Sequence, residues 1–262
     1  PGQYDSHDVT IQDVFEAVGT HAAGNMTDQQ LATLEAAACP GAGACGGQFT
    51  ANTMSMVCEL IGISPMGDNA VPALDGRKEE VAQDAGKLVM ELARSNRCPR
   101  QVMTREALEN GIASVAATGG STNAVLHMLA IAREAEVPLG LEDFDRISRN
   151  TPYIADMKPA GRYVMEDLSR YGGIALVMKR LLAAGLLKGD AITVTGKTLA
   201  ENLEDVETID DQPIITEVDS PRSPTGGLAI LRGNLAPEGA VIKVAGHQER
   251  VFRGPARVFN QE

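Results

Sequence analysis

Apolar residues recur at helical spacing along most of the chain. Two such stretches begin with sequences resembling capping boxes, in which a Thr and a residue three positions later exchange hydrogen bonds: Thr10–Asp13 and Thr27–Gln30. Further stretches place their apolar residues on one helical face. The pattern predicts helices after both boxes, over 46–61, 79–94, 104–117 and 121–135, in two pieces of 163–184 that meet at Gly172-Gly173, and after a third box at Thr198–Glu201, with one short strand at 191–195.

The pattern changes at the turn-rich stretch 219–227. Beyond it lie three strand-like segments, at 228–231, 240–244 and 257–259. We therefore expect an α/β fold, in which residues 1–222 form a helix-rich layered domain with a parallel sheet and residues 223–262 begin a β-barrel-like domain. Because three short strands make a poor independent sheet, we expect the second domain to be truncated and to continue in a longer parent chain.

Composition narrows the classes of protein that the chain can represent. It has 262 residues, a net charge of −12 and a sequence pI of about 4.8, so we expect neither nucleic acid nor an anionic membrane as a partner. No apolar run is long enough to span a bilayer, and the first residues lack the basic and apolar stretches of a signal peptide. These features predict a cytoplasmic location, or an organelle matrix in a eukaryote, where the four cysteines stay reduced.

The segment from Cys39 to Gly47 carries the most distinctive chemistry. Four of its residues are glycines, which let the backbone approach another group closely. Cys45 lies at the start of the helix predicted over 46–61, where the helix dipole favours a thiolate. The spacing of Cys39 and Cys45 matches neither a zinc site nor a ferredoxin cluster. Three interpretations stay open at this point: an activated Cys45, a cysteine that only completes a turn, and a redox pair of both thiols.

Four strings resemble the dihydroxyacid dehydratases, a family grouped with the phosphogluconate and sugar-acid dehydratases. The first is the cysteine loop extended to residue 54, CPGAGACGGQFTANTM. The others are DVTIQDVFEAV at 8–18, ATGGSTNAVLH at 117–127 and MKPAGRYVMED at 157–167. They follow the family's order along the chain. Gln48 stands where the family usually has Met, a departure that affects no catalytic group. By this resemblance the chain is a central fragment of a family member.

The resemblance implies an iron–sulfur cluster, [2Fe–2S] in preference to [4Fe–4S], together with Mg²⁺. Three cysteines hold the cluster in the family, and only the last has a counterpart here, Cys45, while Cys39 is a candidate accessory thiol. The two earlier cysteines are expected upstream, and no Cys-Asp-Lys motif, which helps the family to bind magnesium, occurs in this sequence. The serine base and a magnesium-binding Glu are expected beyond Glu262. We therefore expect domain 1–222 to be N-terminally incomplete, with no catalytic residue and no Mg²⁺ ligand in this chain.

A second candidate site lies at the turn before the helix predicted over 121–135. Gly120, Ser121, Thr122 and Asn123 precede free helical N–H groups, which suit a carboxylate or phosphate. Their hydroxyl and amide groups add donors, so these four are candidate substrate-binding residues. Ordinary N-capping by Ser121 explains the same pattern without a ligand.

The resemblance also implies a reaction for the parent protein. A hydro-lyase of this kind dehydrates 2,3-dihydroxy-3-methyl carboxylic acids to 2-keto acids in branched-chain amino-acid biosynthesis. Its partners are the small-molecule dihydroxy acid and further copies of itself, in a homodimer or a dimer of dimers. We expect this chain to be inactive alone. Two alternatives stay open: a sugar-acid dehydratase of the same superfamily, and a non-catalytic fragment used only in assembly.

Overall fold

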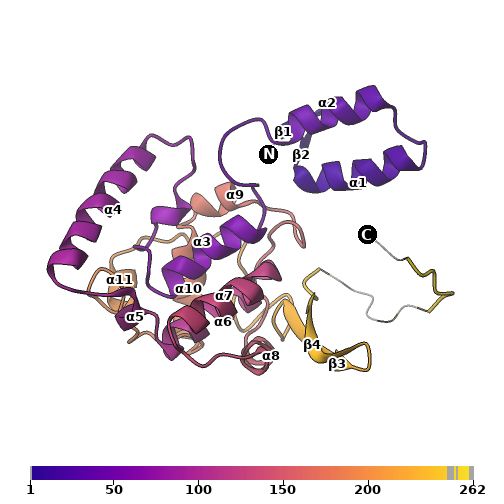
Figure 1. The fold of residues 1–262 in the computed structure, drawn as a ribbon. Helices are drawn as coiled ribbons and strands as arrows, with labels where there is room; N and C mark the ends of the chain where they lie inside the picture. The colour runs from indigo at the N-terminus through magenta and orange to yellow at the C-terminus, as the bar shows by residue number, and fades with distance from the viewer. Residues whose placement is uncertain (1, 247–250, 252, 260–262) are drawn as a thin grey trace.

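The computed structural model describes residues 2–246, 251 and 253–259 and forms a helix-rich body with a small N-terminal unit beside it (Figure 1). The strands are β1 (Gly2–Tyr4), β2 (His7–Val9), β3 (Leu228–Gly233) and β4 (Ala236–Lys243). The helices are α1 (Ile11–Ala22), α2 (Asp28–Ala38), α3 (Thr50–Leu60), the 3-10 helix Asp68–Ala70, α4 (Arg77–Arg94), α5 (Pro99–Val102), α6 (Arg105–Thr118), α7 (Asn123–Glu134), α8 (Leu141–Asn150), α9 (Met165–Ser169), α10 (Ile174–Ala183) and α11 (Leu199–Glu204).

Helix α6 runs through the centre of the body. Eleven of its 14 residues are buried, and α3, α7 and α8 pack against it. The helix begins where Thr104 accepts a hydrogen bond from the Ala107 amide at 3.2 Å. It ends at Gly119, whose φ of 59° is left-handed and whose Cβ would lie 2.6 Å from that of Ala245. Glycine is therefore required at this end, and the chain turns there toward α7.

The N-terminal unit has an apolar core of its own. The antiparallel pair β1–β2 precedes α1 and α2, and α1 packs against α2. The capping boxes predicted at Thr10 and Thr27 are confirmed, because each Thr exchanges hydrogen bonds with the residue three positions later. The buried residues of this unit are Val9, Val14, Ala17, Leu34 and Ala38.

The C-terminal hairpin β3–β4 lies against the same body. Strand β3 packs on α8, and the Ser148 hydroxyl donates to the Leu228 carbonyl at 2.6 Å. Leu228 and Ala245 belong to the main apolar core. Two of the three strands predicted in this part of the chain are confirmed, at 228–231 and 240–244, with β4 starting four residues earlier.

The other strand predictions fail. Residues 191–195 form a turn, in which the Thr193 amide donates to the Lys197 carbonyl at 2.9 Å and only Ile192 makes a bridge, to Thr198. The Thr193 hydroxyl also bonds to the Lys197 carbonyl, so local side-chain hydrogen bonds replace the strand ladder. Segment 257–259 has no regular structure, since no strand lies beside it among the described residues.

The described part of the chain contains two antiparallel hairpins as its sheets, so the predicted parallel sheet and barrel-like character are not confirmed. The coarser prediction, a helix-rich α/β chain, agrees with the helices and small antiparallel sheets of the described residues. The part of the 223–262 prediction that falls on 247–250, 252 and 260–262 lies outside the described residues.

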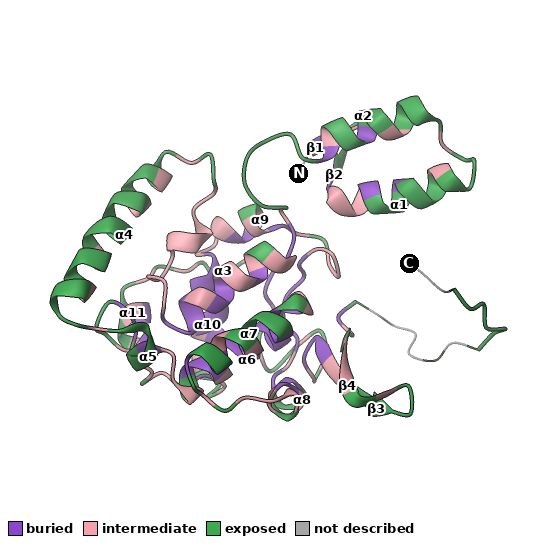
Figure 2. Ribbon diagram, viewed as in Figure 1, coloured by how far each residue is buried: buried purple, intermediate pink, exposed green. Residues whose placement is uncertain are grey.

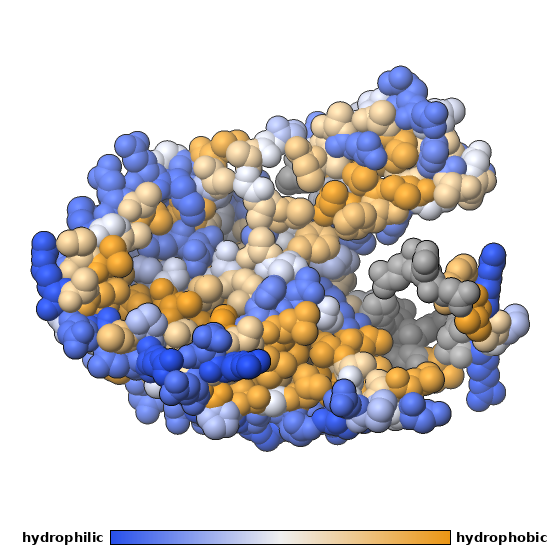
Figure 3. All heavy atoms as spheres, viewed as in Figure 1, coloured by the Kyte–Doolittle hydropathy of each residue, from blue (hydrophilic) through white to orange (hydrophobic). Residues whose placement is uncertain are grey.

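Helix α4 stands at the edge of the body and buries none of its 18 residues (Figure 2). Val89 and Met90 on it are 58% and 52% exposed. Apolar surface also appears over α1 and near α7 (Figure 3), where Phe15 and Leu126 are among the exposed side chains. Across the described ranges, no helix combines the length and apolar character that a bilayer crossing requires.

Candidate functional site

Three of the four strings singled out in the sequence meet at the start of α3. The cysteine loop joins the segment 157–167 through two backbone bonds, from the Gln48 amide to the Lys158 carbonyl (2.6 Å) and from the Met165 amide to the Gly46 carbonyl (2.8 Å). It joins the turn before α7 through Thr53, whose hydroxyl accepts from the Ser121 amide at 3.0 Å. The tertiary structure thus gathers segments that lie about 70 to 120 residues apart along the chain.

The loop places both candidate thiols at the surface. Cys39 ends α2, and Cys39 and Cys45 are both exposed and free. The prediction that a helix begins at Gly46 is wrong, because α3 begins at Thr50. Glycine has a low helix propensity, and the backbone groups of Gly46 and Gln48 are already bonded to the segment 157–167. Cys45 therefore lies outside the first turn of α3, and the helix-dipole argument for its thiolate does not apply.

Asn52 ties the loop to α3, a role that the sequence analysis missed. Its Nδ2 donates to the carbonyls of Cys45 and Gly47, both at 2.7 Å. Asn52 is the third residue of the helix, from which a side chain can reach back toward the preceding turn. That position is the signal in the sequence that could have identified it.

The turn before α7 lies directly against the start of α3. A Cβ on Gly120 would lie 2.8 Å from the Thr53 side chain, so glycine permits the close approach. The Thr50 hydroxyl lies 3.2 Å from the Ser121 hydroxyl and accepts from Asn123 Nδ2 at 2.8 Å. The first turns of two helices therefore meet, with their polar side chains bonded to one another.

Of the four candidate substrate-binding residues, three carry polar side chains, and these differ in what they do. Ser121 Oγ accepts from the Asn123 amide at 3.2 Å, as expected of an N-capping group. Thr122 makes no capping hydrogen bond, and Asn123 is exposed. This arrangement is the one expected of N-capping, and the amides of Asn123, Ala124 and Val125 already donate to other groups of the turn.

A buried polar pair supports the loop from inside. Gln48 is 2% exposed, and its Nε2 donates to the Thr118 hydroxyl at 3.3 Å, which in turn donates to the Ser114 carbonyl at 2.8 Å. The Gln48 Oε1 atom is buried and has no partner among the described residues. The residue that departs from the family pattern therefore carries an unsatisfied acceptor beside α6.

Asp156 holds the segment 157–167 in its conformation. It is 1% exposed and accepts from Arg162 Nε at 2.7 Å, with Arg222 Nη1 at 3.3 Å. Its carbonyl also accepts from the Tyr163 amide at 3.0 Å. The charged anchor is thus buried while Arg162 reaches solvent, and it holds the turn against which the cysteine loop is packed.

Metal binding at this site rests on Cys45. Within residues 2–246, 251 and 253–259, no three His, Cys, Asp or Glu side chains come together as a metal site. The exposed thiol of Cys45 is a soft donor that fits one coordination position of an iron–sulfur cluster.

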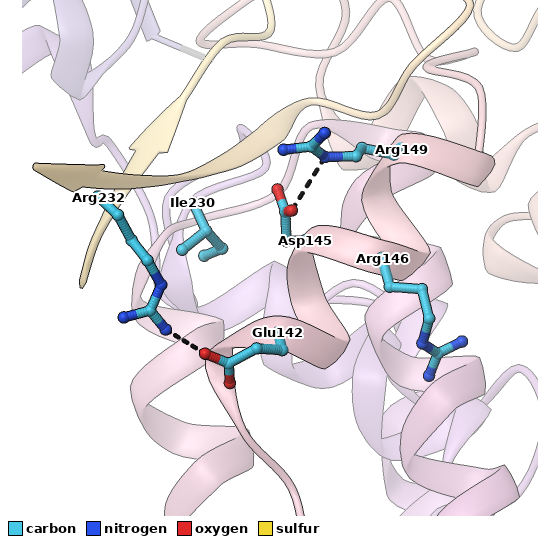
Figure 4. A pocket seen from close by; sticks show the side chains of 6 residues that line it. All are labelled: Glu142, Asp145, Arg146, Arg149, Ile230 and Arg232. Atoms are coloured by element: carbon cyan, nitrogen blue, oxygen red, sulfur yellow. Dashed lines mark hydrogen bonds and ion pairs between the residues drawn. The ribbon is translucent and has the colours of Figure 1, made fainter. Parts of the chain in front are cut away.

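A pocket of about 320 Å³ lies elsewhere, between α8 and β3 (Figure 4). Its charged groups are largely paired with one another: Arg149 Nε contacts Asp145 at 2.9 Å, and Arg232 contacts Glu142. Neither Cys45 nor any residue of the turn before α7 lines it. The pocket is therefore a surface depression lined by ion pairs, and it is separate from the candidate site.

The family of the chain follows from comparisons with known proteins. Residues 1–202 match the family model described as Dihydroxy-acid/6-phosphogluconate dehydratase N-terminal, and residues 213–262 match its C-terminal counterpart. Over its whole length the chain is 58% identical to the dihydroxy-acid dehydratase of Koribacter versatilis, 56% to that of Roseiflexus castenholzii and 51% to that of Thermus thermophilus. It spans 46% of the first relative and 47% of the other two. The chain therefore belongs to the dihydroxy-acid/6-phosphogluconate dehydratase family.

Proposed function

We propose that the chain is the central part of a hydro-lyase, a dihydroxyacid dehydratase. The parent protein converts 2,3-dihydroxy-3-methyl carboxylic acids to 2-keto acids in branched-chain amino-acid biosynthesis. The observation that supports this is the meeting of the cysteine loop, the turn 120–123 and the segment 157–167 beside the exposed Cys45. Relatives that match the full chain carry the name dihydroxy-acid dehydratase.

Cys45 is proposed as one of three thiolate ligands, with Cys39 as an accessory thiol. Polarisation of the C3 hydroxyl is the chemistry that an iron–sulfur cluster, [2Fe–2S] in our proposal, supplies when bound. Within this chain, the Asn52 and Gln48 contacts hold the Cys45 turn in place. The other two cysteines and the Mg²⁺ ligands are proposed to come from the rest of the parent protein.

The turn 120–123 is proposed to bind the substrate carboxylate. The Asn123 side chain is exposed, and its bond to Thr50 uses one of the two Nδ2 hydrogens, so the other offers a donor to an anion. The reaction removes the C2 proton and the C3 hydroxyl as water, and the resulting enol becomes the 2-keto acid. The base that accepts the proton is proposed to be a serine outside this chain, so this chain contributes binding and positioning.

The experiment that tests this proposal compares this chain with its full-length parent. Both are reconstituted anaerobically with iron, sulfide and Mg²⁺, and 2-keto acid formation from 2,3-dihydroxy-3-methylbutanoate is assayed. We expect turnover by the parent only, with iron binding and turnover lost in Cys45→Ser and retained in Cys39→Ser. Turnover by this chain alone would contradict the proposal that the other ligands and the base come from the rest of the parent protein. An unchanged iron content in Cys45→Ser would exclude Cys45 as a ligand.

One alternative reaction is kept because the matching family model also covers 6-phosphogluconate dehydratases. A sugar-acid dehydratase would prefer arabinonate or 6-phosphogluconate over the branched dihydroxy acid. A substrate panel on the reconstituted parent decides between them. If neither class of substrate is turned over by a folded, iron-loaded parent, the non-catalytic assembly role becomes the better proposal.

Further features of the parent are proposed on the same basis. They are a boundary between a cluster-binding domain at 1–222 and a β-rich domain at 223–262, assembly as a homodimer or dimer of dimers, and a cytoplasmic or organelle-matrix location. Mössbauer spectroscopy of the loaded parent distinguishes [2Fe–2S] from [4Fe–4S], and sedimentation gives the assembly state.

A further inference from the structure

The backbone turn that carries Cys45 has its carbonyls fully occupied. Asn52 Nδ2 donates to the carbonyls of Cys45 and Gly47. Between these two, the Gly46 carbonyl accepts from the Met165 amide at 2.8 Å. Three consecutive carbonyls are therefore bonded, and a single side chain supplies two of the three donors.

Close packing holds the other side of the same turn. A Cβ on Gly47 would lie 3.0 Å from the Lys158 carbonyl and 2.8 Å from the Phe49 ring. A Cβ on Gly46 would lie 3.3 Å from the Val164 side chain. The turn is thus pressed against the segment 158–164 on one side and tied to α3 by Asn52 on the other.

We propose that Asn52 is the positioning residue for Cys45. A carboxamide NH₂ carries two donors, so one Asn side chain can bond both carbonyls at once and hold the turn in one conformation, with Cys45 at the surface. The functional meaning of this positioning rests on the proposed role of Cys45 as a ligand. The positioning itself depends only on the contacts of Asn52.

A substitution of Asn52, the third residue of α3, can separate its role in holding the Cys45 turn from any role in stabilising the helix. A carboxylate in the first turn of a helix is favoured by the helix dipole. Asn52→Asp has nearly the same shape and should leave α3 intact. It replaces the two donors with acceptors, however, and these would face the carbonyls of Cys45 and Gly47. The substitution therefore releases the turn while keeping the helix.

Hydrogen exchange in the folded, cluster-free chain tests the positioning directly. The amides of Gln48 and Met165 bond across the turn without touching Asn52, so their exchange reports whether the turn stays closed. In Asn52→Asp and Asn52→Ala we expect their exchange to accelerate about tenfold or more, because a local opening becomes accessible. Amides in the middle of α3 and in α6 should exchange as in the wild type. Asn150→Asp, at an exposed position of α8, is the matched control and should change neither peptide.

A second readout follows cluster assembly in the parent protein. We expect Asn52→Asp to lower the iron bound per chain and to alter the visible circular dichroism of the cluster, with Asn150→Asp at the wild-type level. Exchange at Gln48 and Met165 that matches the wild type in both Asn52 variants would overturn the positioning role. If Asn52→Ala fails to fold, Asn52→Asp alone decides.

The two readouts keep this inference separate from the proposed function. If Cys45→Ser binds as much iron as the wild type, the ligand role fails, while the exchange result for Asn52 still stands. If Cys45→Ser loses iron and Asn52→Asp leaves both exchange and iron content unchanged, the ligand role stands and the positioning role is wrong.

Discussion

Helices α6 and α4 were both predicted from the same kind of periodic pattern, yet they have opposite roles in the molecule. Eleven of the 14 residues of α6 are buried, whereas α4 buries none of its 18. Helix α6 packs against α3, and its end at Gly119 leads into the turn that meets the cysteine loop. Periodicity therefore identifies a helix, but only its neighbours determine how much of the stability and of the site depends on it.

The candidate site is built on the buried helices. Thr118 in α6 bonds to Gln48 of the cysteine loop, and Thr53 in α3 bonds to the turn before α7. Helix α4 contributes no residue to these contacts among those described. Changes in α6 and α3 should therefore affect both the stability of the protein and the geometry of the site, while changes in α4 should affect the stability only slightly and leave the site unchanged.

The largest expected effect is the removal of apolar volume from α6. Leu108 is completely buried, so Leu108→Ala should lower the free energy of unfolding by about 2–5 kcal/mol. Val89 in α4 is 58% exposed, and Val89→Ala should change it by less than about 0.5 kcal/mol. Urea denaturation of both variants gives the values. Similar losses in the two variants would contradict the division between the helices.

The next effect concerns a buried carboxyl at the C-terminal end of α3. Glu59 is 1% exposed, and burial raises its pKa from 4.5 to about 7, although the amides of Gly67 and Asn69 donate to it. Because the folded-state pKa lies above the unfolded one, the stabilisation from this group is full below about pH 4.5 and is lost as the pH rises to about 7.

The pH dependence of stability therefore depends on Glu59. Between pH 5 and pH 8 the wild type should lose on the order of 3 kcal/mol more than Glu59→Gln. Urea denaturation at several pH values measures both slopes, and Val89→Ala, in α4, should keep the wild-type slope. Equal slopes for the wild type and Glu59→Gln would mean that this carboxyl is ionised in the folded chain across the whole range.

Replacing one glycine in each helix with alanine should change the stability of the protein in opposite directions. A Cβ on Gly111 in α6 would lie 2.8 Å from the Met128 methyl group and 3.0 Å from Ile61, whereas nothing lies within 4 Å at Gly86 in α4. Gly111→Ala should destabilise the protein by about 1–2 kcal/mol, since crowding outweighs the gain in helix propensity. Gly86→Ala should stabilise it by about 0.5–1 kcal/mol. Thermal unfolding shows both signs, and a shared sign would contradict the prediction.

The smallest effect tests the contact between α6 and the cysteine loop. Gln48→Met replaces the buried amide with the residue usual in the family and removes the unpaired Oε1. We expect a stabilisation of up to about 1 kcal/mol, measured by urea denaturation. A loss of stability would show that the hydrogen bond to Thr118 outweighs the unpaired oxygen.

Short-range signals predicted much of the local structure. The capping boxes at Thr10, Thr27 and Thr198 each begin a helix, because their hydrogen bonds close within three residues. The start of α3 was placed four residues too early, since the glycines of the loop are bonded to a segment more than 100 residues away. The turn at 191–195 was missed for a related reason, because its apolar residues look like a strand while its threonines bond locally.

The sequence by itself determined where most helices lie, which loop carries the distinctive thiol, and to which family the chain belongs. These features depend on residues close together in the chain or on strings that can be compared directly. The tertiary structure decided that α6 is buried while α4 is exposed, and that Cys45 lies outside the helix. It also decided that Gln48 meets Thr118 and that Thr50 meets Ser121, across 70 and 71 residues. Such contacts depend on how distant segments pack together, and no local pattern encodes that packing.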